Sequence, residues 1–250
     1  MNRYGEFIQI GNGGNGIVYS AIDTETKNKV VLKYDNNEDP STYWREMNAL
    51  NRIANIEGVP KIVDSFVTPY RVIVTEFIEN TMDVFDYQNE YSPISEEESS
   101  YIIKQLCIIL LNIDKVGVQH NDIKDENIII NLNTKNITLI DFGCATLDGA
   151  RDTTIELGTK VFHPIEYARH KHYDDVKYNM WGLGCLLYRL IYNIDNPSMY
   201  EENKIESDNQ DKTQIKVSEK CIAFMDACFK LDPQQRQTYE QAIKHDWIRG

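Results

Sequence analysis

One stretch near the middle of the chain constrains the fold more than any other. The eight residues from His120 to Asn127 hold one His, two Asp, two Asn, one Lys, one Glu and one Ile. They run directly into an apolar segment, 128–130, and a polar turn separates that segment from a second one, 137–140. Two short apolar runs on either side of a polar turn predict a β-hairpin. Its open end would place Asn127 beside Asp141, which follows the second run.

The residues at that open end have the chemistry of a cation site next to a base. The Asp141 carboxylate and the Asn127 amide oxygen are ligands that a hard cation prefers. Asp122 lies five residues before Asn127, where it is free to act as a base. Lys124 could neutralise a transferred phosphate. A polar loop before a hairpin would explain the turn, but not this set of residue types.

The stretch resembles the catalytic loop of eukaryotic protein kinases, H-R-D-x-K-x-x-N, followed by their metal-binding motif D-F-G. Asp141-Phe142-Gly143 matches the second motif, and Asn121 takes the place of the Arg in the first. The resemblance implies an α+β, bilobal protein kinase fold, with a small antiparallel-sheet lobe that carries one main helix and a larger, mainly helical lobe. We expect a single kinase domain over 1–250, with its N-lobe, hinge and C-lobe at 1–76, 76–80 and 81–250.

A glycine motif near the N-terminus fits the same family. Gly11, Gly13 and Gly16 have the G-x-G-x-x-G spacing between two apolar runs that predict strands. Glycine lets backbone N–H groups approach a polyphosphate without a Cβ in the way. The spacing alone is a weak signal, because dinucleotide-binding folds share it. A strand rather than a helix follows the glycines here, which disfavours the dinucleotide interpretation.

A lysine and a glutamate follow in the predicted order. Val30–Lys33 predicts a third strand, and Lys33 falls at the strand-lysine position of the kinases. A helix is predicted next, with Asp39 as N-cap and Pro40 as its first residue. Its apolar stripe at helical spacing comprises Tyr43, Met47, Leu50 and Ala54. Glu46 flanks that stripe, and each of the two charged residues alone would be an ordinary surface group. The resemblance instead implies that Glu46 pairs with Lys33 and directs it at the nucleotide phosphates.

The resemblance also implies an ATP site between the lobes. Two more strands, 59–66 and 70–74, would complete the small lobe, and Thr75 would be the gatekeeper before the hinge. Adenine would bond to the hinge backbone, so side-chain identity is uninformative there. The residues expected to line the nucleotide site are Gly11, Gly13, Gly16, Val18, Val31, Lys33, Thr75, Glu76, Ile78, Ile129 and Asp141.

The reaction implied by the resemblance is transfer of the ATP γ-phosphoryl group to a Ser or Thr hydroxyl of a protein. Asp122 would orient the hydroxyl and accept its proton, and Lys124 would stabilise charge on the moving group. A Mg²⁺ ion would be the second cofactor. The expected catalytic residues are Asp122, Lys124, Lys33 and Glu46, and the expected metal ligands are Asn127 and Asp141.

The residues after D-F-G, the activation segment (144–166), favour serine/threonine over tyrosine specificity. Gly158-Thr159 resembles the G-T of serine/threonine kinases, whose Thr hydroxyl contacts both the catalytic Asp and the catalytic-loop Lys. Pro164-Ile165-Glu166 resembles the A-P-E that ends the segment. The stretch 232–238 resembles the large-lobe motif D-P-x-x-R-P-T, so Arg236 is expected to pair with Glu166 as a structural contact.

Within the kinases the chain is most similar to the Pim family, over 83–87, 120–130 and 217–247. Pim-like kinases carry acidic residues beside the substrate cleft and prefer Arg or Lys upstream of the target. The resemblance therefore implies a basic protein substrate. The expected substrate-binding residues are Asp83, Asp86, Asp125, Glu126 and Thr159. An ordinary solvated acidic face is the alternative, because a net charge of −13 supplies several such residues by itself.

Four departures from the family pattern bear on regulation. Asn121 replaces the Arg that usually receives a phosphate from the activation segment, so we expect activity without phosphorylation, although Thr153 and Thr154 are available. Asn179 replaces an Asp that accepts backbone bonds from the catalytic loop, and its amide oxygen can still accept. Gln237 replaces Pro at what we expect to be a surface turn. We expect little room for a regulatory segment, because the connection from Lys33 to the helix with Glu46 is short and this sequence has almost no residues outside the kinase motifs.

Two other functions remain open. A pseudokinase scaffold would bind nucleotide and partner proteins without turnover. It predicts the loss of Lys33, Asp122 or Asp141, all of which are present, but the changes at Asn121 and Asn179 keep it open. A small-molecule phosphotransferase would have a related fold. The segment expected to dock a peptide, Gly158-Thr159 and Pro164-Ile165-Glu166, argues against this function.

Charge and cysteine content limit the partners and the compartment. The net charge of −13 argues against nucleic acid and anionic membranes and suits a cationic partner. Apolar stretches are too short or too interrupted to span a bilayer, and the N-terminus lacks the apolar core of a signal peptide. Five cysteines without a C-x-x-C pair fit a reducing compartment. We therefore expect a monomer of the cytoplasm or nucleus.

Overall fold

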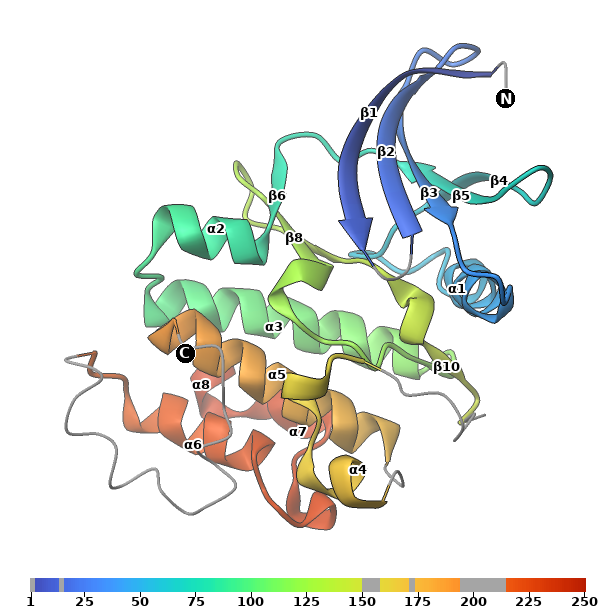
Figure 1. The fold of residues 1–250 in the computed structure, drawn as a ribbon. Helices are drawn as coiled ribbons and strands as arrows, with labels where there is room; N and C mark the ends of the chain where they lie inside the picture. Colours follow the sequence, from blue (N-terminus) through green and yellow to red (C-terminus); the bar gives the residue numbers. More distant parts are fainter. Residues whose placement is uncertain (1–2, 14–15, 150–157, 171–173, 194–214) are drawn as a thin grey trace.

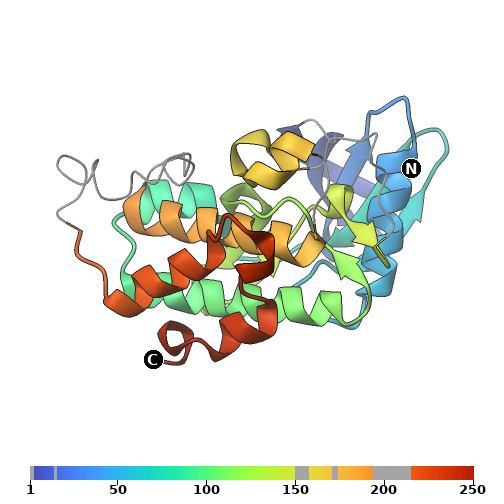
Figure 2. The same cartoon turned by 90° about the horizontal axis from the view of Figure 1, so that it is seen from below.

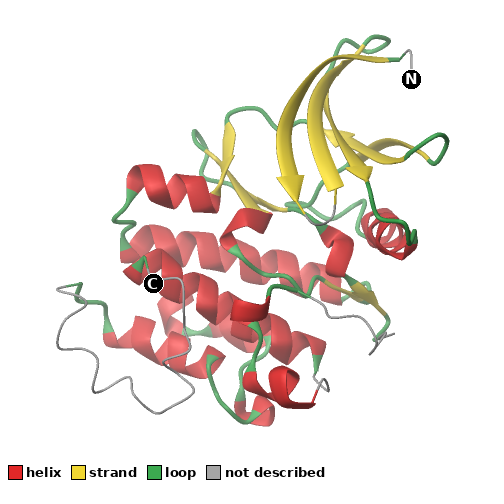
Figure 3. Ribbon diagram, in the orientation of Figure 1, coloured by secondary structure: helices red, strands yellow, loops and turns green. Residues whose placement is uncertain are grey.

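The computed structural model describes residues 3–13, 16–149, 158–170, 174–193 and 215–250. An antiparallel sheet with one helix forms the first part of the fold, and helices dominate the second part, as Figure 1 and the colouring by secondary structure in Figure 3 show. The N-terminus lies at the far end of the sheet and the C-terminus among the helices. This is the bilobal arrangement expected from the sequence.

The sheet positions four residues of the expected nucleotide site on one face. Its strands are β1 (Tyr4–Gly13), β2 (Gly16–Asp23), β3 (Lys29–Asp35), β4 (Ile62–Phe66) and β5 (Arg71–Glu76), in the order β1-β2-β3-β5-β4. Val18 pairs with Lys33, and Val31 pairs with Thr75. Directly opposed residues share a face and side chains alternate along a strand, so all four lie on the same face. The opposite face buries a small core of Tyr4, Ala21, Val30, Leu32, Val72 and Val74.

Helix α1 (Ser41–Arg52) begins one residue later than the sequence predicts and ends before Ala54, the last residue of the predicted stripe. Pro40 is the N-cap rather than the first helical residue, and the Asp39 carboxylate accepts from the Ser41 backbone N–H at 3.0 Å. Asp39 therefore stabilises the turn before the helix, as aspartates do when they bond to the backbone two residues on. Ala54 lies beyond the last helical turn. Glu46 is on the buried face of α1, next to Met47.

The second part has more elements than the sequence analysis predicts. They are, with η for a 3₁₀ helix, β6 (Thr81–Asp83), α2 (Val84–Tyr91), α3 (Glu96–Asp114), β7 (Val118–Gln119), η1 (Asp125–Asn127), β8 (Ile128–Asn131), β9 (Ile137–Leu139), η2 (Phe142–Cys144), β10 (Thr146–Leu147), η3 (Lys160–Phe162), α4 (Ile165–His170), α5 (Asp175–Tyr192), α6 (Glu219–Cys228), η6 (Pro233–Gln235), α7 (Tyr239–Lys244) and α8 (Asp246–Arg249). Their side chains, with those of α1, form the main hydrophobic core.

The predicted hairpin is present and has a third strand. β8 and β9 are antiparallel, with Ile128 opposite Leu139, and β6 pairs with the other edge of β8. The Ile140 N–H donates to the Asn127 carbonyl oxygen at 2.8 Å, so the ladder continues to the open end of the hairpin. This contact brings the chain around Asn127 next to the start of the metal motif.

Two helices support the loop that precedes the hairpin. The side chain of Ser95 caps α3, accepting from the Glu98 N–H at 3.1 Å. α5 lies beside α3 in the view of Figure 2 and buries residues on most of its sides. Gly182 on α5 lets the catalytic loop approach closely, because a Cβ there would lie 3.2 Å from the Ile123 Cβ. The loop is thereby held against the helical core.

Three further observations complete the fold. Gln237 is buried, so the predicted surface turn is wrong; its side-chain amide donates to the Cys228 Sγ at 3.0 Å. All five cysteines are free thiols. Within the described residues, no helix has both the length and the apolar character that a membrane span requires.

Candidate active site

Lys33 joins the sheet, helix α1 and the metal motif. Its Nζ lies 2.9 and 2.7 Å from the two carboxylate oxygens of Glu46 and 2.7 Å from Asp141 Oδ1. β3 supplies the lysine, the buried face of α1 supplies the glutamate, and the residue after β9 and Ile140 begins the metal motif. The structure therefore brings together three residues that the sequence analysis assigned to phosphate and metal binding.

The charge state of Lys33 follows from this geometry. Burial would lower the pKa of Lys33, but the carboxylates of Glu46 and Asp141 outweigh burial and raise that pKa above its usual range. The ammonium group is therefore protonated at neutral pH. It is therefore a fixed positive charge between Glu46 on α1 and Asp141.

Asp122 is the centre of the catalytic loop (120–127). Its Oδ1 accepts from the Thr159 hydroxyl at 2.8 Å, and its Oδ2 accepts from Asn127 Nδ2 at 2.9 Å. Lys124 Nζ lies 3.3 Å from Asp122 Oδ2 and donates to Thr159 Oγ1 at 3.1 Å. Burial would lower the pKa of Lys124, but the carboxylates of Asp122 and Glu126 raise it. A carboxylate, an ammonium and two neutral polar groups thus meet at one point, with Asp122 9% exposed.

His120 fixes the backbone of Asp122. Its Nδ1 accepts from the Asp122 N–H at 3.2 Å, which leaves Nε2 as the protonated nitrogen, 2.9 Å from the Ile140 carbonyl oxygen. The ring also packs edge-on against Phe142, at 4.8 Å between centroids. Burial lowers the pKa of His120, so the imidazole is neutral. One buried ring therefore connects the catalytic loop to both sides of Asp141.

The two asparagines that depart from the kinase pattern contact each other. Asn179 Oδ1 accepts from the Asn121 N–H at 2.8 Å, which is the backbone bond expected of the usual Asp. Asn179 Nδ2 donates to Asn121 Oδ1 at 3.2 Å. Asn121 Nδ2 in turn donates to Thr146 Oγ1 at 3.0 Å. Thr153 and Thr154, the expected phosphorylation sites, lie outside the described residues.

The expected nucleotide site is lined from both parts of the fold. Gly16 requires glycine, because its φ is +130° and a Cβ would lie 1.9 Å from the Tyr34 carbonyl oxygen. Thr75 and Glu76 end β5, so the hinge begins at the last strand residue. Ile129 lies on β8 opposite Asp83, in the register of the three-stranded sheet. Among the other expected residues, Gly11 and Gly13 belong to β1 and Ile78 to the segment between β5 and β6.

The expected metal ligands have the chemistry of a Mg²⁺ site that a nucleotide completes. Both donors of Asn127 Nδ2 bond to Asp122, at 2.8 Å to its carbonyl oxygen and 2.9 Å to Oδ2. This orientation leaves the amide oxygen of Asn127 for a cation. The described residues hold no cluster of three or more His, Cys, Asp or Glu side chains that could bind a metal ion alone. Mg²⁺ is usually held by one or two carboxylates together with substrate phosphates, which fits Asp141 and Asn127.

The acidic residues predicted to bind substrate do not behave alike. Asp125 is 1% exposed, and its Oδ2 lies 2.8 Å from Arg189 Nε on α5. It is therefore part of a buried ion pair and does not belong to an exposed acidic surface. Asp83, Asp86 and Glu126 keep some or most of their surface exposed. Burial raises the pKa of Asp83, and the carboxylates of Asp86 and Glu126 raise it further, so the three charges lie close together.

The expected structural pair at the end of the activation segment is formed. Arg236 Nη1 and Nη2 lie 2.8 and 3.2 Å from the two carboxylate oxygens of Glu166. The same guanidinium donates to the carbonyl oxygens of Lys177 and Lys230 and stacks over Trp181 at 5.0 Å. α4 is thereby attached to α5 and to the loop before η6.

Three polar side chains near the site were not predicted. Arg45 donates to the Gly143 carbonyl oxygen at 2.9 Å, Thr146 bonds Asn121, and Arg189 pairs with Asp125. Arg45 could have been suspected, because it directly precedes Glu46 on a predicted helix. Nothing in the sequence indicates the other two, since their partners lie 25 and 64 residues away.

Comparison with known proteins agrees with this arrangement. Residues 4–248 match the family model described as a protein kinase domain. Serine/threonine-protein kinase pim-2 of Danio rerio is 29% identical over 259 residues, covering 96% of this chain and 82% of that protein. Serine/threonine-protein kinase prk-2 of Caenorhabditis elegans is 28% identical, over 96% of this chain and 57% of its own length. Serine/threonine-protein kinase 1 of African swine fever virus is 27% identical, over 95% of this chain and 78% of its own.

Proposed function

We infer that this chain, which belongs to the protein kinase family, transfers the γ-phosphoryl group of ATP to serine or threonine hydroxyls by means of the residues around Asp122. The observation that carries the assignment is the set of contacts to the Asp122 carboxylate. Thr159 and Asn127 bond its two oxygens at 2.8 and 2.9 Å, and Lys124 lies 3.3 Å away. These contacts hold one carboxylate in a fixed orientation.

The proposed mechanism relies on positioning and charge. Asp122 orients the substrate hydroxyl and accepts its proton, while Lys124 stabilises the negative charge of the moving group. Lys33, held by Glu46, binds the α- and β-phosphates. Asp141 and Asn127 would hold Mg²⁺, which would supply positive charge to neutralise the phosphates. Preorganised charges of this kind supply most of the rate enhancement in such sites.

The direct test replaces Asp122 with Asn and measures transfer of labelled γ-phosphate to Ser/Thr peptides. We expect a loss of roughly a thousandfold in kcat, because a general base contributes on the order of 10²–10⁴. Nucleotide binding should be unchanged. Asp226→Asn, at an exposed aspartate on α6, is the matched control and should keep full activity. Wild-type protein that binds nucleotide without any transfer would support the pseudokinase scaffold instead.

We also propose that activity does not depend on phosphorylation of the activation segment. A neutral Asn121 offers no guanidinium to a phosphate, and its side chain is already bonded to Thr146. Protein treated with a phosphatase should therefore transfer phosphate as fast as untreated protein. A purified chain that becomes active only after phosphorylation at Thr153 or Thr154 would refute this.

The proposed substrate is a protein with basic residues upstream of the target. Three acidic side chains support this, Asp83, Asp86 and Glu126, whose mutual repulsion a bound Arg or Lys would relieve. The name of one relative, pim-2, agrees with the Pim resemblance that suggested the preference. Asp125 is not included, because Arg189 already neutralises it.

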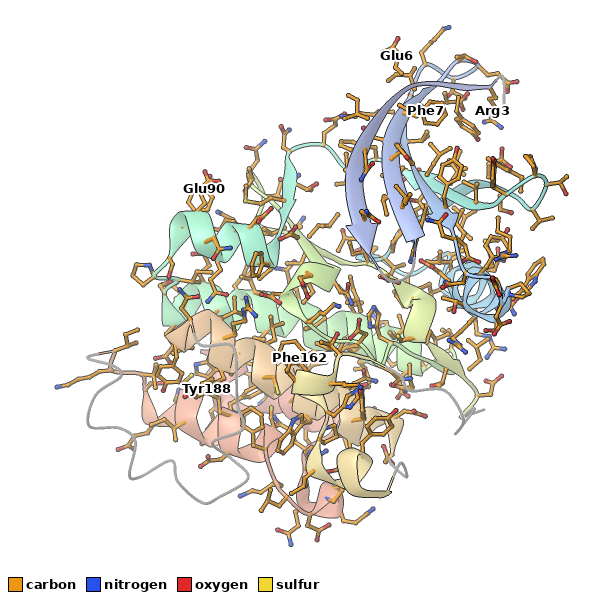
Figure 4. The ribbon with its side chains drawn as sticks, viewed as in Figure 1. Arg3, Glu6, Phe7, Glu90, Phe162 and Tyr188 are labelled. Carbon is orange, nitrogen blue, oxygen red and sulfur yellow. The ribbon has the colours of Figure 1, made fainter. Side chains whose placement is uncertain are left out.

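The substrate proposal is tested with the double variant Asp86→Asn, Glu126→Gln. We expect kcat/KM for an Arg-rich peptide to fall about fivefold through KM, because two partly screened charges are worth about 1 kcal/mol. Glu90→Gln is the matched control, since Glu90 is exposed at the outer end of the same helix α2 (Figure 4). Equal rates of the wild type on basic and acidic peptides would contradict the preference.

A further inference from the structure

A series of buried hydrogen bonds runs from helix α7 to strand β10. Tyr239 OH donates to Gln119 Oε1 at 2.9 Å, and Asn179 Nδ2 donates to the same oxygen at 3.1 Å. Asn179 Nδ2 also donates to Asn121 Oδ1 at 3.2 Å, and Asn121 Nδ2 donates to Thr146 Oγ1 at 3.0 Å. All five side chains are buried. Bonds of this kind are costly to break, because a buried donor or acceptor is then left unpaired.

The orientation of each amide in the series is determined by its neighbour. The Asn121 N–H must donate to an oxygen, so Asn179 presents Oδ1 to it at 2.8 Å and turns its NH₂ group toward Asn121 Oδ1. Asn121 then turns its own NH₂ group toward Thr146 Oγ1, and toward the Cys144 carbonyl oxygen at 3.4 Å. An Asp at 179 would have no proton for Asn121 Oδ1. The two departures from the kinase pattern therefore complement each other.

The backbone at Asn121 also favours this residue. Its φ is +63°, in the left-handed region that asparagine tolerates better than most residues. The Asn121 carbonyl oxygen lies against Gly158, where a Cβ would be 2.6 Å away. Gly158 in turn donates to Cys144 Sγ at 3.4 Å. Asn121 thus contacts the beginning of the activation segment through its side chain and Gly158, in the later part of that segment, through its backbone.

The bond between Asn121 and Thr146 affects the site through strand β10. Thr146 pairs with Gln119 and Leu147 with Val118, so β10 is anchored to β7 immediately before the catalytic loop. Only four residues separate Thr146 from Asp141. Holding Thr146 therefore limits the directions in which the metal motif can leave the site.

We propose that Asn121, oriented by Asn179, is a positioning residue that holds β10 against the catalytic loop through Thr146 and so keeps the metal motif in its working arrangement. The inference rests on the proposed kinase function and gives its independence of phosphorylation a physical cause. A neutral amide bonded within the protein takes the role that an added phosphate and a guanidinium would otherwise share.

The test is a double-mutant cycle with Asn121→Gly and Thr146→Val. Glycine adopts the positive φ readily and removes the side-chain amide, and valine keeps the shape of threonine without its hydroxyl. We expect Thr146→Val to lower kcat by about tenfold, with KM for ATP within about twofold, because the buried bond between the two side chains is lost. Asn121→Gly should lower kcat at least as much, since it also removes the bonds to the Cys144 carbonyl oxygen and from Asn179. The double variant should be no slower than the slower single variant. Thr146→Ser, which keeps a hydroxyl, should restore most of the rate.

Hydrogen exchange supplies a second measurement that does not need turnover. The backbone amides of Thr146 and Leu147 should exchange about tenfold faster in both single variants than in the wild type. Thr24→Val is the matched control, since it also removes one threonine hydrogen bond, 2.7 Å to the Arg3 carbonyl oxygen, at the far end of the sheet. It should change neither kcat nor exchange in β10.

The outcomes separate this inference from the proposed function. Thr146→Val within twofold of the wild type in both kcat and exchange, or additive losses in the double variant, would overturn the role of Asn121 and leave the kinase function intact. A wild type that transfers no phosphate, but whose β10 exchange responds to both variants, would remove the proposed function and keep the contact.

Discussion

At the scale of single residues, the site depends on side chains that are fully occupied by their own neighbours. Asp122 has defined partners on both carboxylate oxygens, and Lys33 has three. His120 uses both ring nitrogens, with Nδ1 as acceptor and Nε2 as donor. Such groups lose little freedom when substrate binds, because folding has already ordered them.

His120 makes stability depend on pH in a defined direction. Its folded-state pKa is lowered by burial, while the unfolded chain has the ordinary value of about 6.5. Between these two values the unfolded chain binds a proton that the folded chain does not, so stability is fully present above about pH 6.5 and falls as the pH drops below it. Protonation would also set two N–H groups, Nδ1–H and the Asp122 N–H, against each other.

Urea unfolding between pH 7.5 and 5.5 checks this. The wild type should lose stability over that interval, and His120→Gln, which cannot titrate, should lose measurably less, whatever its stability at pH 7.5. His245 also has a pKa lowered by burial but is more exposed, so His245→Gln should change the pH dependence less. An unchanged pH dependence in His120→Gln would contradict the assignment of a neutral buried imidazole.

At the scale of elements, the connection between β3 and α1 decides whether Lys33 and Glu46 meet. Arg71 on β5 donates from Nε to Asp35 Oδ2 at 2.7 Å and from Nη2 to the Asn37 carbonyl oxygen. Asp35 also accepts from the Asn37 N–H at 2.9 Å. One arginine thus secures both the end of β3 and the turn that leads to α1. The short approach to the helix is therefore held by the sheet.

Replacing Arg71 with Met should therefore weaken the Lys33–Glu46 pair from a distance. We expect kcat/KM to fall about fivefold and amide exchange over residues 36–40 to accelerate, because a charge-assisted bond of roughly 1.5–3 kcal/mol is lost. Arg52→Met is the matched control on α1; its pair with Asp148 is mostly exposed and should matter little. Wild-type kcat/KM in Arg71→Met would show that packing alone positions α1.

At the scale of the whole molecule, one buried guanidinium joins the end of the activation segment to the helical part. Arg236 is 1% exposed and bonds Glu166 on α4 as well as two backbone carbonyl groups. In Figure 4, Phe162 marks the neighbouring η3, which lies between the catalytic loop and α4. The position of Glu166, at the end of the activation segment, therefore depends on Arg236, which lies 70 positions later in the chain.

Arg236→Met should destabilise the fold by about 3 kcal/mol, because Glu166 would be left with an unpaired, mostly buried charge. Arg236→Lys should cost less, since it keeps the charge but loses the paired geometry and the stacking on Trp181. Equilibrium urea unfolding measures both. Equal losses in the two variants would show that shape, rather than the charge of Arg236, is what Glu166 requires.

Sequence was sufficient for the family and the bilobal fold, because these depend on local patterns, and it named residues that the structure brings together around Lys33 and Asp122. The hairpin came from two apolar runs and a turn, and the catalytic residues came from fixed spacing within 120–127 and 141–143. The match to a protein kinase domain over 4–248 confirms the fold and the family. The start of α1 was displaced by one residue, because Asp39 bonds the turn instead of capping the helix.

Only the tertiary structure decided which of several similar residues are buried and paired and which stay exposed. Asp125 and Glu126 are neighbours with the same charge, but α5 brings Arg189 to Asp125 and buries it, while Glu126 stays exposed. Gln237 was expected at the surface and packs against α6. Asn121 and Asn179 looked like two separate losses of charge, yet their amides bond each other. The physical reason is common to all of these cases: burial and pairing depend on segments that are distant in the chain and meet only when it folds.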